Sequence, residues 1–220
     1  MLYKKKRINQ KAFMNELLEN KYANNIVKLK CYKKGEEITF INDKYIGFLK
    51  RGVIAESIYG TYLLKKKNEF INLGLLFSGY NKKSQPRAIN ITNSEILWID
   101  KKYINEFISV NPIFIEMLIE EINTTYHRTI EGIVYQPKNI NYLDYVENIL
   151  RDISSTLDLQ SEFSVDKLFE VCRVPQVKKE QVINSLREKN VIKICPNGYG
   201  KIVSSKEITV GWTFIYIDRK

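Results

Sequence analysis

The side chains with the clearest chemical signature lie between residues 164 and 206, and that signature is attraction to a polyanion. Residues 173–206 hold eight Lys/Arg against two Glu, whereas residues 140–172 hold two Lys/Arg against seven Asp/Glu. Clustered lysines are suited to phosphate groups, and Gln side chains among them add donors and acceptors that match base edges. The pattern predicts that this region binds double-stranded DNA. A helix pair whose lysines only coat a solvated face is the alternative.

Two short helices are predicted to position these side chains. In the first helix, apolar residues recur at helical spacing at Phe163, Val165, Leu168, Phe169 and Cys172. A break at residues 173–175 then places Pro175 where a helix can begin without losing a backbone hydrogen bond. The second helix is predicted over residues 176–189, and its buried side would be Val182, Ile183 and Leu186. Its outward side would be Gln176, Val177, Lys178, Glu180, Gln181 and Asn184.

Two β-type runs, 191–194 and 201–203, follow the second helix and indicate a hairpin. The Asn197-Gly198 pair between them is expected to supply the positive φ angles of a tight turn. Helix, turn, helix and hairpin in this order predict a winged helix-turn-helix. Residues 208–217 alternate like one more strand, which we expect to pack against this unit.

Other kinds of chemistry have little support in the sequence. There is one histidine, no phosphate-binding loop and no Gly-x-Ser-x-Gly elbow, so we expect no enzyme, no cofactor and no metal. Three scattered cysteines form no disulfide framework, and their odd number fits a reducing cytoplasm. No apolar run is long enough for a membrane span, and the basic start lacks the apolar core of a secretory signal. We therefore expect a cytoplasmic protein.

The first half of the chain is predicted to be a β-sandwich or β-barrel. With 220 residues, a net charge of +10 and 44% apolar residues, the chain suits two folded domains. Seven or eight short β-type runs follow one another between residues 27 and 99, after an amphipathic helix over 11–22. The lysine run at residues 65–67 is expected to coat a solvated face.

A long helix is predicted from residue 112 to about residue 135. Its apolar residues recur in alternating steps of four and three, at Ile115, Ile119, Ile122, Tyr126, Thr129 and Ile133. This spacing is typical of a coiled-coil seam and favours a homodimer over a helix buried within one subunit. A second stripe is expected to cover the β-domain, at Phe114, Met117 and Leu118. Pro137 predicts a hinge at residues 135–140.

Four short motifs follow one another along the chain: Lys33-Lys34-Gly35-Glu36-Glu37-Ile38, Phe48-Leu49-Lys50-Arg51-Gly52-Val53, Ile96-Leu97-Trp98-Ile99 and Ser185-Leu186-Arg187-Glu188-Lys189-Asn190-Val191-Ile192. Their order and separations resemble the Crp/Fnr family of bacterial transcription regulators. The resemblance implies an α+β chain with a cyclic-nucleotide-binding-like jelly roll over 1–110, a dimerisation helix and hinge over 111–138, and a winged helix-turn-helix over 139–220. It also implies promoter DNA and RNA polymerase as partners.

The resemblance assigns roles to individual residues of the second helix and the hairpin. The three base-reading positions fall on Gln176, Val177 and Gln181, in place of the usual Arg-Glu-Arg set. Gln can pair with adenine and Val can touch a thymine methyl group, so a pseudo-palindromic, AT-leaning site is expected. The residues expected to contact phosphates are Lys178, Lys179, Lys193 and Lys201. Arg173 stands where the family usually has Gly.

The residues that bind cyclic AMP in the family are poorly matched. The nearest counterparts are Glu69, Arg87 and Thr129, but Asn68 and Ile130 replace the Gly and Ser beside them. A cyclic nucleotide is therefore not expected, which leaves a different small molecule, a peptide or constitutive DNA binding. Three cysteines are too few for an iron–sulfur sensor, and His127 alone gives no basis for haem. The alternative function is a ligand-binding or protein-interaction module with a vestigial helix-turn-helix.

Overall fold

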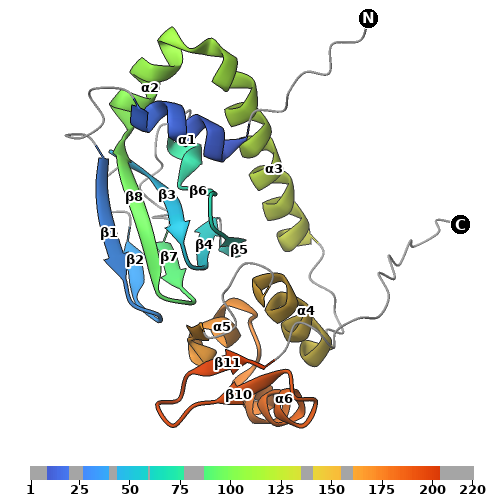
Figure 1. Cartoon of the computed structure of the whole chain (residues 1–220). Helices are drawn as coiled ribbons and strands as arrows, with labels where there is room; N and C mark the ends of the chain where they lie inside the picture. Colours follow the sequence, from blue (N-terminus) through green and yellow to red (C-terminus); the bar gives the residue numbers. More distant parts are fainter. Residues whose placement is uncertain are drawn as a thin grey trace, which may run out of the picture.

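The computed structural model describes residues 9–19, 27–39, 44–58, 60–76, 87–134, 141–154 and 161–203. A roll formed by strands β1 to β8 occupies the upper part of the molecule in Figure 1, with the long helix α3 beside it. A smaller unit of helices with a short sheet lies below the roll. The predicted hinge at residues 135–140 and the predicted strand at residues 208–217 lie outside the described residues.

The roll consists of two antiparallel sheets, and it confirms the predicted number of strands within the described part of residues 27–100. One sheet has the order β1 (Val27–Tyr32), β8 (Ser94–Asp100), β3 (Tyr45–Arg51), β6 (Phe70–Ile71). The other has the order β2 (Glu37–Thr39), β7 (Arg87–Asn90), β4 (Ile54–Ile58), β5 (Thr61–Lys65). Leu49, Ile71 and Ile96 of the first sheet share a buried cluster with Ile54 and Ala88 of the second. The two sheets are therefore held together by apolar side chains that alternate along the strands.

Helices cover one end of the roll through a cluster of aromatic rings. The covering elements are α1 (Gln10–Glu19), the short 3-10 helices η2 (Leu73–Leu76) and η3 (Pro112–Phe114), α2 (Lys101–Val110) and α3 (Ile115–Val134). The ring of Phe13 meets the rings of Phe70, Phe107 and Phe114 edge-on, with centroids 5.1 to 5.6 Å apart. Edge-on pairs of this kind favour one fixed arrangement of the helices over the sheet.

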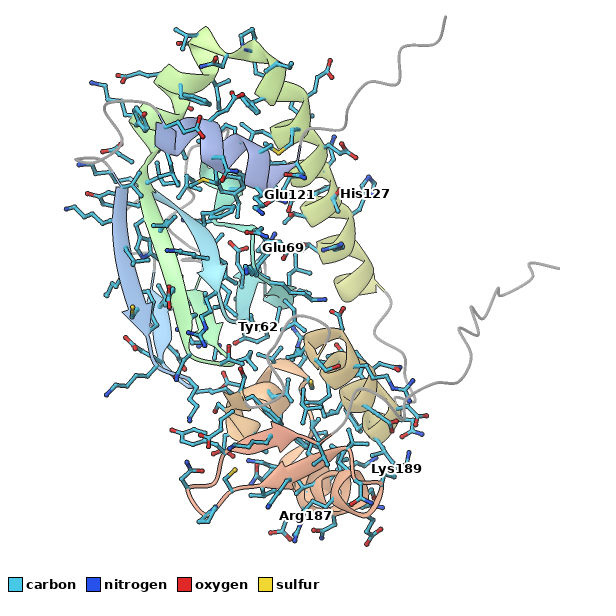
Figure 2. The ribbon with its side chains drawn as sticks, viewed as in Figure 1. Tyr62, Glu69, Glu121, His127, Arg187 and Lys189 are labelled. Carbon is cyan, nitrogen blue, oxygen red and sulfur yellow. The ribbon has the colours of Figure 1, made fainter. Side chains whose placement is uncertain are left out.

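Helix α3 packs on the roll through the stripe predicted for it. Phe114, Met117 and Leu118 are buried against the aromatic cluster. Farther along, the ammonium group of Lys65 on β5 lies 3.4 Å from a carboxylate oxygen of Glu121 and 3.3 Å from the hydroxyl of Thr125. Glu121 lies on the side of α3 that faces the roll, as Figure 2 shows. The prediction of a solvated lysine run is thus wrong for Lys65, because that side chain pairs with α3 and is buried.

The C-terminal unit is built from three helices and a short antiparallel sheet. The helices are α4 (Tyr142–Ser154), α5 (Val165–Val171) and α6 (Gln176–Glu188), and the strands are β9 (Glu162–Phe163), β10 (Ile192–Ile194) and β11 (Gly200–Ile202). The sheet has the order β10-β11-β9. The helix, turn, helix and hairpin predicted for residues 164–203 are all present. Phe163, predicted as part of the first helix, instead lies on β9, because Ser164 caps the start of α5. The core of this unit is continuous with Val53, Ala55, Ile89 and Ile91 of the roll.

Candidate nucleic-acid interface

The turn between α5 and α6 is a Schellman motif centred on Arg173. The amide of Arg173 donates to the carbonyl of Glu170 and the amide of Val174 donates to the carbonyl of Phe169, each at 3.0 Å. These bonds satisfy the last carbonyl groups of α5 and require a left-handed residue between them. Arg173 supplies it with φ 53°. The position where the resembling family usually has Gly therefore does adopt a positive φ, although the residue is Arg.

Helix α6 presents the outward face that its periodicity predicts. Val182 and Leu186 are buried against α5 and the sheet, and Ile183 packs beside them. All six residues predicted to face outward are exposed. Val177, at 90% exposure, is the most exposed of the large apolar side chains in the described residues. Val177 therefore exposes an apolar side chain to water near the start of α6, on the face that also carries Gln176 and Gln181. Such a side chain is suited to contact with a partner.

The hairpin after α6 forms as predicted, but its turn uses one left-handed residue and not two. Gly198 has φ 78°, whereas Asn197 is not among the residues with positive φ. The amide of Gly198 donates to the carbonyl of Cys195 at 2.9 Å, and the side chain of Asn197 accepts from the amide of Tyr199 at 3.2 Å. A type I turn followed by a left-handed glycine accounts for this pattern.

The four lysines predicted to contact phosphate have different surroundings. Lys193 is exposed and lies directly opposite Lys201 across the β10–β11 ladder. Lys201 is 3.7 Å from Glu162, and Lys178 lies over the ring of Tyr142 at 5.3 Å from its centroid. Lys179 is already ion-paired with Asp166 of α5. Among the residues that the structure describes, Lys193 is thus the one of the four lysines without a carboxylate or aromatic partner.

Side chains of the roll contact the hairpin and α5, and no sequence pattern predicted these contacts. Lys34 pairs with Glu162 and lies over the ring of Tyr199, 3.9 Å from its centroid. The hydrogen bond from Lys34 holds the pKa of the Glu162 carboxyl below its usual value. Lys167 of α5 bonds Glu37 of β2 at 2.6 Å and lowers the pKa of that carboxyl in the same way. These pairs join residues about 130 positions apart, so local spacing could not reveal them.

The residues predicted to form the seam of a dimer divide into two rows on α3. Ile119 and Tyr126 are exposed, at 46% and 57%, whereas Ile115 and Ile122 lean against the core of the roll. Thr129 is buried and its hydroxyl donates to the carbonyl of Thr125 at 2.8 Å. The side chain of Ile133 lies outside the described residues. His127 projects from the side of α3 away from the roll (Figure 2).

The three counterparts of the family's nucleotide-binding residues each have partners within the protein. The carboxylate of Glu69 accepts from the amide of Lys66 at 2.8 Å and closes the turn between β5 and β6. Arg87 donates to the hydroxyl of Tyr62 at 2.6 Å, and Thr129 is bonded to its own helix. No group of three or more His, Cys, Asp or Glu gathers for a metal within the described residues, and no described helix could span a membrane.

Solved structures with the same fold are known, although no protein-family model matches the sequence and no curated protein matches it significantly. FixK2 from Bradyrhizobium japonicum has a TM-score of 0.59 at 9% identity, over 82% of this chain and 94% of that one. A cyclic nucleotide-binding domain containing protein from Listeria monocytogenes has a TM-score of 0.57 at 16% identity, over 87% and 96%. A protein from Eubacterium rectale assigned to the Crp/Fnr family of transcriptional regulators has a TM-score of 0.59 at 11% identity, over 88% and 91%.

Proposed function

We propose, from the fold that this chain shares with Crp/Fnr regulators, that it is a DNA-binding transcription regulator and not an enzyme. The observation that carries the proposal is the outward face of α6. Gln176, Val177 and Gln181 are exposed on that face, beside a hairpin that carries Lys193 and Lys201. A helix of this kind would fit the major groove, and the hairpin lysines would contact phosphates beside it. The protein would act in the cytoplasm together with RNA polymerase.

The exposed side chains suggest which bases are read. Gln176 and Gln181 each offer an amide that can pair with the edge of adenine, and Val177 offers methyl groups to a thymine methyl. Arginine, which most often reads guanine, is absent from these three positions. The proposed target is therefore an AT-leaning sequence.

A homodimer through α3 would place two such helices on one duplex. Ile119 and Tyr126 lie seven residues apart on α3, and both are exposed apolar side chains. A second copy of the same helix would cover both side chains and would pair the two subunits about a twofold axis. The expected site is then a pseudo-palindrome whose half-sites lie about one helical turn apart.

Selection from random duplexes tests the proposal, followed by titration of the recovered sequence with variants. Gln181→Ala should lose about 1 to 3 kcal/mol of discrimination at one position of each half-site. Lys201→Ala should weaken all duplexes alike and lower the slope of log K against log salt by about one. Lys50→Ala, which changes an exposed lysine on strand β3 of the roll, is the control and should change neither quantity.

The competing function is an interaction module whose helix-turn-helix no longer reads DNA. In that case selection would recover no palindrome, binding would be salt-sensitive and indifferent to sequence, and Gln181→Ala would behave like the control. The structure supports the regulator because the predicted reading residues are exposed and none of the described residues covers them.

A further inference from the structure

Helices α5 and α6 both end in a Schellman motif, but the residues that adopt the left-handed conformation differ in how well they tolerate it. Asn190 closes α6 with φ 53°, and its amide and that of Val191 donate to Arg187 and Leu186 at 2.9 Å. Arg173 closes α5 with the same φ. Asn tolerates the left-handed region because its short side chain can hydrogen-bond to the nearby backbone. The long side chain of Arg does not provide this local hydrogen bond, so the conformation is strained for Arg. The side chain of Arg173 must therefore contribute something that outweighs the strain.

The contact that Arg173 makes is with the roll and not with its own unit. Its guanidinium donates to the carbonyl of Gly60, in the turn between β4 and β5. Glu170, one turn earlier, lies 3.5 Å from the hydroxyl of Tyr62 and 3.7 Å from Arg87. Tyr62 lies at the end of the roll that faces the C-terminal unit, as Figure 2 shows. Glu170 and Arg173, one helical turn apart, thus both connect the end of α5 to the β4–β5 hairpin.

Other contacts between the roll and this unit lie on the same side. The amide of Ser164 donates to the carbonyl of Ile91 at 2.8 Å, and Thr92 forms an isolated bridge with Phe163. Asp152 of α4 pairs with Lys66. All of these contacts come from α4, β9, α5 and the turn, and the outward face of α6 takes no part in them. Docking on the roll therefore fixes the direction of α6 and leaves its reading face open.

We propose that Arg173 is a positioning residue that couples the helix-turn-helix to the β4–β5 hairpin, so that the roll sets the orientation of α6. The role in DNA reading rests on the proposed function. The physical basis is preorganisation, because a recognition helix held in the binding direction loses less freedom when it enters the groove. The strained φ is retained because Gly at this position would relax the turn but would lose the link to Gly60.

Replacing Arg173 by Gly tests the coupling, and Asn190→Gly is the matched control because it relaxes the equivalent turn without touching the roll. Hydrogen exchange of the Ser164 amide reports docking directly, since its acceptor lies on the roll. We expect Arg173→Gly to speed that exchange about 2- to 10-fold, the effect of losing one ordinary hydrogen bond. Arg173→Lys keeps a donor and should restore part of the protection. Asn190→Gly should leave the exchange unchanged.

Binding to a selected duplex provides the second measurement. Arg173→Gly should weaken it by a similar factor without lowering the midpoint of urea unfolding, which separates orientation from stability. Unchanged Ser164 exchange in Arg173→Gly, equal acceleration in Asn190→Gly, or tighter DNA binding by Arg173→Gly would each overturn the coupling. If the unaltered protein selects no sequence at all, the proposed function fails, while the exchange measurements still decide whether Arg173 docks the unit.

Discussion

Glu56 is an ionisable residue whose side chain is almost completely removed from water. It lies on β4 with 3% of its surface exposed, and its carboxylate accepts from the amide of Asn72 at 2.6 Å. Burial raises the pKa of this carboxyl above its ordinary value of 4.5, and the nearby Lys65 opposes the rise only in part. A carboxyl whose pKa is higher in the folded state than in the unfolded state makes folding depend on pH.

The sign of that dependence gives the first prediction. Because the folded pKa is raised, the stabilisation is complete below pH 4.5 and is lost as the pH rises through the folded value. In Glu56→Gln the amide oxygen still accepts from Asn72, but the group no longer ionises. Urea unfolding from about pH 5 upward should therefore show a steeper loss of stability in the unaltered protein than in the variant. A constant difference between the two at all pH values would contradict the assignment.

At the same scale, some residues could be interpreted from the sequence and others could not. The positions of Val182, Leu186 and Gln181 follow from a helical period alone, and the structure agrees with each. The burial of Lys65 does not follow, because its partner Glu121 is 56 positions away on another element. Arg173 is intermediate: the family resemblance indicated that a glycine is usual there, whereas the contact that Arg173 makes in its place, with Gly60, lies on the roll.

Among the elements, the sheet of the C-terminal unit depends on close approach between β9 and β11. Gly200 on β11 is paired with Phe163 on β9, whose ring is almost completely buried. A Cβ atom on Gly200 would lie 2.4 Å from a ring carbon of Phe163, well inside van der Waals contact. Only glycine lets the hairpin close over this ring.

The second prediction follows from that contact. Gly200→Ala should cost about 1 to 3 kcal/mol of unfolding free energy, as expected for overpacking in a core. Because the clash separates β11 from β9, amides of the hairpin should exchange faster than those of α6. Gly74→Ala is the control, since a Cβ there meets nothing within 4 Å. Equal losses for the two variants in urea unfolding would show that the Phe163 contact is unimportant.

Most of the elements were predictable, but α2, α4 and β9 were not. Strands divided by turn residues, the long helix and the helix-turn-helix all have local periodicities, and all are present. Helix α2 was not predicted, because Tyr103, Ile104, Phe107 and Ile108 follow a strand directly with no glycine or proline between. Asp100 was the available signal, since its side chain caps the helix by accepting from the amide of Lys102 at 2.9 Å.

On the scale of the whole molecule, the roll and the C-terminal unit share one apolar core. Ile89 and Ile91 of the roll belong to the same buried cluster as Phe163, Leu168 and other apolar residues of the C-terminal unit. Sequence alone suggests two domains that fold separately, because nothing local indicates that strands near residue 90 pack against residues near 165. A continuous core couples the stability of the two parts, since neither can separate without exposing apolar surface.

The last prediction follows from this shared core. Ile91 is fully buried and its carbonyl accepts from the amide of Ser164, so Ile91→Ala leaves a cavity at the junction of the two parts. The loss should be about 2 to 5 kcal/mol and should appear in both parts at once. Calorimetry should show one transition shifted to lower temperature, with amides of α6 and of β3 losing protection together. A variant that keeps the roll intact while α4 to β11 unfold at a separate, lower temperature would show that the two parts are independent.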